Sequence, residues 1–69
     1  MGLTQRQIKV INDMISNLDE NISFEEKHEE LMDKCLDKEL FDLEDDEDGD
    51  IYQGYSNEVW DFLENIINN

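Results

Sequence analysis

Apolar residues recur at helical spacing near the start of the chain. They follow one another at intervals of three and four residues, at Ile8, Ile11, Ile15 and Leu18. This spacing places them along one face of an α-helix. Thr4, just before the pattern, is a good N-cap residue because its hydroxyl can accept a hydrogen bond from a free backbone N–H. The pattern therefore predicts a first helix over about 4–18.

A second helical pattern starts at Ser23. Ser23 and Glu26 have the spacing of a capping box, in which each side chain binds the backbone N–H of the other residue. The apolar positions that follow are Phe24, Leu31, Met32, Cys35, Leu36 and Leu40. We predict a second helix over about 23–41.

A third helical pattern lies near the end of the chain, where Ser56 or Asn57 can serve as its cap. Its apolar positions are Val59, Trp60, Leu63, Ile66 and Ile67, which predict a helix over about 56–67. Outside the three helices, only the short stretch 51–55 has a strand-like pattern. The sequence therefore predicts one all-α domain over 1–69, either a small three-helix bundle or a helical hairpin with the third helix laid across it.

Between the second and third patterns the chain is strongly acidic. Seven of the nine residues over 42–50 are Asp or Glu. Such a block repels itself and rarely holds regular structure, and Gly49 and Gly54 allow sharp turns there. We predict an acidic loop over 42–50 between helices two and three.

The charge of the whole chain is −15, and it is unevenly distributed. Residues 19–50 hold 16 acidic side chains against three basic ones. Within the second predicted helix, acidic residues stand four apart at Glu25, Glu29, Asp33 and Asp37, so they share a face. Like charges at this spacing destabilise a helix by about 0.2–0.5 kcal/mol per pair. Because these residues are kept despite their cost to helix stability, they indicate that the negative field has a role in binding.

One metal-binding motif is half present. With Gly49 aligned on the sixth position of an EF-hand loop, the first, third and fifth positions are Glu44, Asp46 and Asp48. The twelfth position, where a bidentate Glu is required, is Tyr55. We expect weak, non-specific screening by cations, with no specific metal site and no cofactor; a Ca²⁺ sensor is one alternative.

The chain has few residues suited to catalysis. His28 is its one histidine, with no second histidine and no paired cysteine, and Cys35 lies on an apolar face in acidic surroundings that do not favour a thiolate. A chain this short also has little room for the apolar pocket that shifts a catalytic pKa. We expect no enzymatic activity.

The composition also bears on compartment and partners. A single cysteine suits a reducing cytosol, and no apolar run approaches the length of a membrane span. Direct nucleic-acid binding requires a basic patch, and this chain has only five basic residues, which are spread along it. A chain with no Pro and no Ala, but with seven Ile and seven Asn, indicates an AT-rich genome such as that of a low-GC bacterium or its phage. We expect a cytoplasmic protein of a bacterial host, bound neither to a membrane nor directly to nucleic acid.

These features favour a small acidic inhibitor of a basic nucleic-acid-processing protein, a nuclease or another nucleic-acid-binding effector. It would imitate a duplex, which is a rod of closely spaced negative charge. In its small size, its acidity and an amino-acid composition typical of an AT-rich genome, the chain resembles phage anti-defence proteins, the class that includes anti-CRISPR and anti-restriction DNA mimics. One alternative is an immunity protein or antitoxin that neutralises a nuclease toxin. Another is an adaptor or regulator whose apolar groove binds a partner helix.

Aromatic residues follow the acidic block. Tyr52 and Tyr55 stand beside it, and aromatic residues next to a charged rim are typical of protein interfaces. Trp60 is expected in the core. The predicted partner-binding residues are Glu25, Glu29, Asp33, Asp37, Glu44, Asp45, Asp46, Glu47, Asp48, Asp50, Tyr52 and Tyr55.

Overall fold

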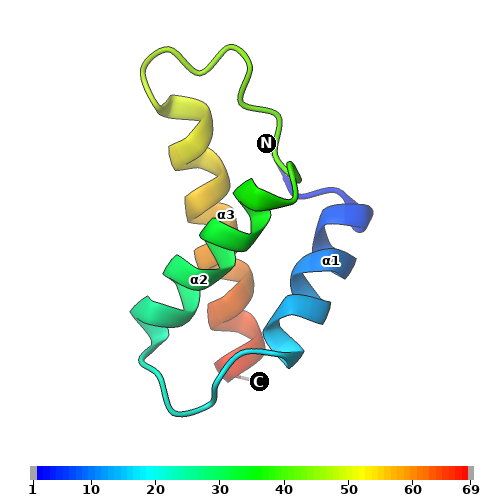
Figure 1. Ribbon diagram of the computed structural model, residues 1–69, viewed down its shortest axis with the longest axis vertical. Helices are drawn as coiled ribbons and strands as arrows, with labels where there is room; N and C mark the ends of the chain where they lie inside the picture. Colours follow the sequence, from blue (N-terminus) through cyan, green and yellow to red (C-terminus); the bar gives the residue numbers. More distant parts are fainter. Residues whose placement is uncertain (1, 69) are drawn as a thin grey trace.

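Three helices form an all-α bundle in the computed structural model, which describes residues 2–68. They are α1 (Gln5–Ser16), α2 (Phe24–Asp37) and α3 (Asp50–Asn68). Helix α2 contacts both α1 and α3, and it lies in front of α3 in Figure 1 with α1 beside it. The domain predicted over 1–69 includes residues 1 and 69, which lie outside the described residues. Within residues 2–68 no strand is present, and no helix is both long and apolar enough to cross a bilayer.

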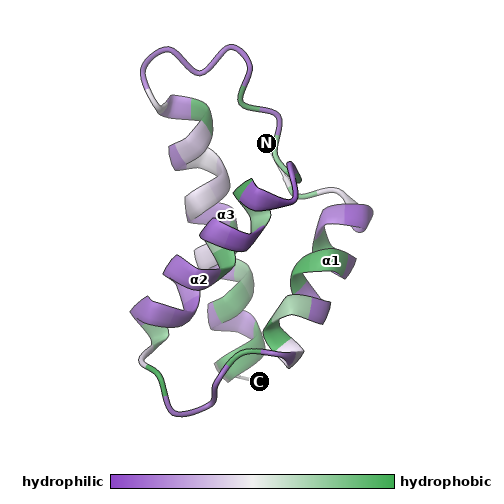
Figure 2. Cartoon of the chain, in the orientation of Figure 1, coloured by the Kyte–Doolittle hydropathy of each residue, from purple (hydrophilic) through white to green (hydrophobic). Residues whose placement is uncertain are grey.

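The core joins the apolar faces of all three helices. Its buried members are Ile11, Met14, Leu18, Leu31, Met32, Cys35, Phe41, Val59 and Leu63. Hydrophilic residues follow the outward side of α2 and the connection to α3 (Figure 2). The apolar faces predicted for the three helices therefore pack together in one core, while the acidic side chains stay outside it.

Helix α1 begins with the predicted cap, Thr4, and ends two residues early. The Thr4 hydroxyl accepts a hydrogen bond from the Gln7 N–H at 3.2 Å, and the Gln7 side chain accepts one from the Thr4 N–H at 2.8 Å. At the other end, the N–H groups of Asn17 and Leu18 donate to carbonyls only three residues back. This tighter winding ends α1 at Ser16 and turns Leu18 into the core.

Helix α2 starts at its predicted cap but ends at Asp37, four residues before the predicted boundary at 41. The Ser23 hydroxyl accepts the Glu26 N–H at 3.2 Å. At the C-terminal end, Glu39 adopts a left-handed conformation with a φ of 51°. The Leu40 N–H then donates to the Cys35 carbonyl at 2.9 Å, in the pattern of a Schellman motif. This turn ends the helix before Phe41, whose ring packs in the core.

Helix α3 begins at Asp50, six residues before the predicted start at 56. The strand-like stretch 51–55 is helical, so that part of the sequence interpretation was wrong. Gly49 stands at the N-cap position, with a φ of 78° and a carbonyl that accepts the Gln53 N–H at 2.9 Å. Because glycine has no side chain to cap the helix, the free N–H groups of the first turn bind either water or the side chain of another residue. Here that residue is Asp46.

Candidate partner-binding surface

The acidic stripe predicted on α2 is exposed along the whole helix. Glu25, Glu29, Asp33 and Asp37 are all exposed to solvent. At a rise of about 1.5 Å per residue the stripe is about 18 Å long. Two further exposed carboxylates, Glu26 and Glu30, lie beside it on the same helix. A shallow depression of about 300 Å³ is lined by Glu26, Glu29, Glu30 and Asp33, so this part of α2 presents a surface made of carboxylates.

The connection between α2 and α3 carries a second group of acidic residues. Its exposed members among the predicted site residues are Glu44, Asp45, Glu47 and Asp48, followed by Asp50 in the first turn of α3. Asp46 is different because it is half-buried and bonded within the chain. Its two carboxylate oxygens accept hydrogen bonds from the backbone N–H groups of Ile51 at 3.2 Å and Tyr52 at 3.1 Å. The structure therefore uses Asp46 as the cap of α3.

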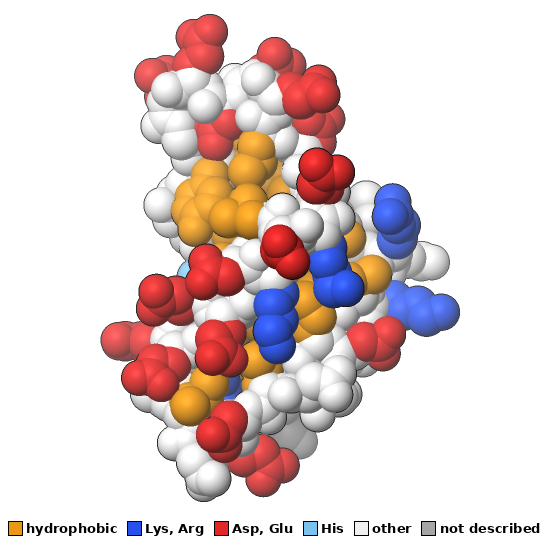
Figure 3. Space-filling view, viewed as in Figure 1, with side chains coloured by type: hydrophobic (Ala, Val, Ile, Leu, Met, Phe, Trp, Pro, Cys, Tyr) orange, Lys and Arg blue, Asp and Glu red, His pale blue; other side chains and the backbone are white. Residues whose placement is uncertain are grey.

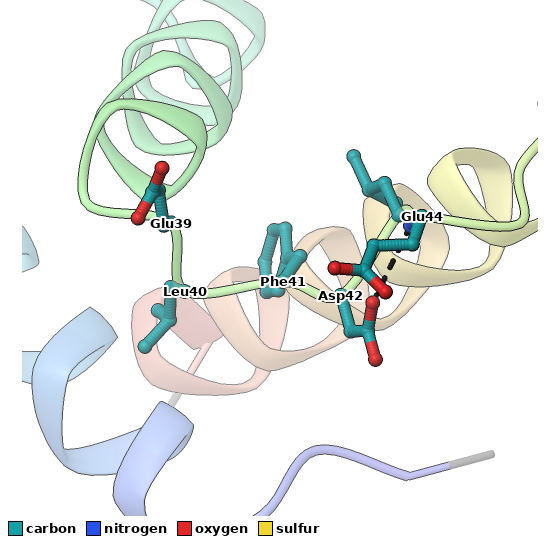
Figure 4. Close-up of a pocket in the computed structure, with 6 residues that line it drawn as sticks. Glu39, Leu40, Phe41, Asp42 and Glu44 are labelled. Atoms are coloured by element: carbon teal, nitrogen blue, oxygen red, sulfur yellow. Dashed lines mark hydrogen bonds between the residues drawn. The ribbon is translucent and has the colours of Figure 1, made fainter.

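The start of this connection forms a mixed acidic and apolar depression of about 390 Å³. It is lined by Glu39, Leu40, Phe41, Asp42, Leu43 and Glu44. Figure 4 shows Glu39 at one end of the depression and Asp42 and Glu44 at the other. The Asp42 carboxylate accepts the Glu44 N–H at 3.3 Å, which holds this short turn.

The acidic side chains do not form one continuous stripe. On the face shown in Figure 3 they gather in two groups, one over the connection and one over α2, with hydrophobic side chains between them. Basic side chains show mostly over α1 and the neighbouring side of α2, where some lie beside acidic ones. Among the described residues other than Glu58, no carboxylate forms an ion pair with a basic side chain. Both groups therefore face the solvent without ion-paired carboxylates among their described residues.

The two predicted tyrosines have different surroundings. The Tyr55 ring is partly buried and stacks on Phe41, with ring centroids 4.3 Å apart and planes 9° apart. Tyr52 keeps 37% of its surface exposed. Leu36, which the sequence interpretation assigned only to an apolar face, is exposed to the same extent.

Trp60 is half-buried, although the sequence interpretation placed it in the core. It contacts the Phe24 ring edge-on at a centroid distance of 4.6 Å and the His28 ring at 5.0 Å. The Nε2 of His28 lies 3.0 Å from the carbonyl oxygen of Ser56. His28 thus joins α2 to α3. Ser56, expected as a helix cap, lies inside α3.

The described residues suited to metal binding or nucleophilic chemistry include Cys35, His28 and Ser56, whose hydroxyl oxygen lies 3.3 Å from the His28 Nε2. Within the described residues, no three His, Cys, Asp or Glu side chains are placed to hold a metal ion together. Burial raises the pKa of the Cys35 thiol to about 11, so it stays protonated near neutral pH. What the surface can do is attract and hold cationic groups. Comparisons with protein-family models, curated proteins and solved structures give no match for this chain.

Proposed function

We propose that this protein is a small inhibitor that occupies the nucleic-acid site of a basic protein by presenting carboxylates where phosphates would bind. The observation that carries the proposal is the exposed acidic surface of α2 and the connection to α3, whose carboxylates form no ion pairs among the described residues. Lys and Arg side chains that hold phosphates are the complementary groups. The partner we propose is a nuclease or another nucleic-acid-binding effector of a bacterial host, and the setting is phage anti-defence.

The spacing of charge on α2 supports mimicry of a nucleic-acid strand. Six exposed carboxylates stand on α2, at Glu25, Glu26, Glu29, Glu30, Asp33 and Asp37. Lys27 and Lys34 stand on the same helix, so the net charge is −4 over about 18 Å, or one negative charge per about 4.5 Å. One strand of duplex DNA carries one charge per about 3.4 Å. A groove that holds a phosphate strand therefore meets a net charge density on α2 that is somewhat lower than that of DNA but of the same order.

The test is competition with DNA at two salt concentrations. Tagged protein first captures its target from nuclease-treated bacterial lysate, and the purified target is then offered duplex DNA and this protein together. Mimicry requires that each displaces the other and that both bind more weakly as salt rises. A captured protein that binds DNA and this chain at the same time would contradict the proposal.

A matched pair of variants tests which carboxylates bind the target. The first replaces three exposed acids of the connection, as Asp45→Asn, Glu47→Gln and Asp48→Asn, and leaves the cap Asp46 in place. The second makes the same change of net charge elsewhere, as Asp13→Asn, Glu20→Gln and Asp61→Asn. If each of the three carboxylates forms an exposed ion pair with the target worth about 0.5 kcal/mol, the first variant should lose about tenfold in affinity at low salt. Equal affinity for the two variants would show that the connection is not the interface.

A further inference from the structure

The face of α3 that builds the core continues past the point where α2 covers it. Tyr52 and Val59 are seven residues apart, which places them nearly in line along α3. Val59 is fully buried, whereas Tyr52 keeps 37% of its surface exposed. Figure 1 shows the reason: the C-terminal end of α2 turns toward α1, while the first turns of α3 continue beyond it. Tyr52 is therefore a core-facing residue without a covering helix.

Leu36 is a second exposed apolar side chain, two turns along α2 from His28, whose ring contacts Ser56 of α3. It lies in the last turn of α2 and also keeps 37% of its surface exposed. The stacked rings of Phe41 and Tyr55 lie one helical turn from Tyr52. We call the exposed side chains of Leu36 and Tyr52 the apolar patch. Single exposed apolar residues are common on protein surfaces, but Figure 3 shows hydrophobic side chains gathered in one exposed area, and such an area favours a binding surface.

The surroundings of the apolar patch identify what it fits. Figure 3 shows hydrophobic side chains between the acidic group of the connection and that of α2. An apolar partner without charge would gain nothing from these two groups, and a purely basic partner would leave the patch in contact with water. The complementary surface is an apolar side chain with Lys or Arg on both sides.

We propose that the apolar patch binds an apolar anchor of the partner, carried on a segment with basic residues on either side of the anchor. This inference rests on the proposed function, and it adds that the target has an apolar residue inside its basic site. The division of work follows from physics. The attraction between the carboxylates and the basic residues of the partner speeds association and weakens as salt rises. The gain from burying the apolar anchor persists at high salt. A few well-packed anchors commonly dominate the energy of such an interface.

Two synthetic peptides of equal charge test the proposal. Both carry Lys-rich flanks, and they differ at one central position, which is Leu in one and Ser in the other. We expect the Leu peptide to bind the full chain about tenfold more tightly, with the ratio maintained as salt rises. Tyr52→Ser and, separately, Leu36→Ser should remove this preference while leaving the salt dependence of both peptides unchanged.

Ile66→Ser is the matched control. Ile66 is on α3 and also keeps 37% of its surface exposed, but it lies near the opposite end of the helix. This variant should keep the full preference for the Leu peptide. Equal, salt-sensitive binding of the two peptides would overturn the anchor and leave the proposed function standing. A dimer of this chain that Tyr52→Ser abolishes would also overturn it, because the patch would then bind a second copy. Failure of DNA competition, tested separately, would instead remove the proposed function.

Discussion

Gln7 shows how one buried polar side chain holds two distant parts of the chain together. Its carbonyl oxygen completes the capping box of α1 with Thr4, and its amide Nε2 donates to the Leu40 carbonyl at 3.1 Å. Leu40 belongs to the turn that ends α2, so the start of α1 is fixed against the end of α2. The sequence indicates Thr4 as a cap from local spacing. It does not indicate the bond to Leu40, because that partner is 33 residues away.

Cys35 gives a prediction for the alkaline range. Burial raises the pKa of its thiol from 9.0 to about 11, so the folded protein disfavours the thiolate. Below about pH 9 the thiol is protonated in both states and does not affect stability. Above that pH the unfolded chain loses the proton first. We expect the free energy of unfolding to fall toward pH 11 by up to about 1.4 kcal/mol per pH unit from this group, as measured by urea titration.

The control for this prediction is Cys35→Ala. It should lower stability at every pH because it leaves a small cavity in the core, but it should lack the thiol's share of the alkaline slope. An identical slope in the two proteins would show that the Cys35 thiol does not cause it.

At the scale of single helices, the start of α3 is decided by a side chain from the acidic block. Asp46 binds the N–H groups of the second and third residues of α3, which Gly49 cannot do. A carboxylate at a helix N-terminus is also favoured by the helix dipole. The acidic block therefore includes at least one residue with a structural role.

Asp46→Ala and Asp45→Ala form a matched pair for this role. Each removes one negative charge from the connection, but only Asp46 caps the helix. We expect Asp46→Ala to be less stable than Asp45→Ala by about 0.5–2 kcal/mol. Amide exchange of Ile51 and Tyr52 should also become faster in Asp46→Ala alone. Equal stability and equal exchange would show that α3 starts at Asp50 without this cap.

The sequence predicts the helices better than their ends. The spacing of apolar residues gave three helices and most of the core, because periodic burial is a local property. The end of α2 was missed because Glu39 adopts a left-handed conformation that is rare for residues other than glycine. The start of α3 was missed because its cap comes from Asp46, four residues before the helix, and because the packing of Tyr55 on Phe41 overrides a strand-like local pattern.

At the scale of the whole molecule, the exposure of the acidic residues followed from the sequence pattern, but their division did not. The sequence predicts an acidic face on the second helix and an acidic loop directly after it along the chain. The structure separates the two acidic groups with hydrophobic side chains, because α2 and the first turns of α3 diverge (Figures 1 and 3). The angle between two helices depends on tertiary packing, which no local pattern contains.

The net charge of −15 makes the stability of the whole protein depend on salt. The molecule measures 35 × 22 × 20 Å. At about 0.01 M salt the Debye length is about 30 Å, so nearly every carboxylate repels every other one; at about 1 M salt it is about 3 Å. We expect the thermal midpoint to rise by several degrees between these conditions, because screening relieves repulsion that the folded state concentrates.

A variant of lower charge and a comparison of two divalent cations test whether screening causes this rise in the midpoint. The variant with Asp45→Asn, Glu47→Gln and Asp48→Asn should melt higher than the unaltered protein at low salt and respond less to added salt, since it has less repulsion to screen. Ca²⁺ and Mg²⁺ at equal ionic strength should have equal effects, because screening depends on charge and not on coordination geometry. A rise in the midpoint with Ca²⁺ alone would contradict simple screening, because a hard cation can be selected only by oxygen ligands held at fixed distances. Glu44 and Asp48 would then be ligands of a bound ion, and the acidic residues of the connection would bind a metal ion rather than a basic partner.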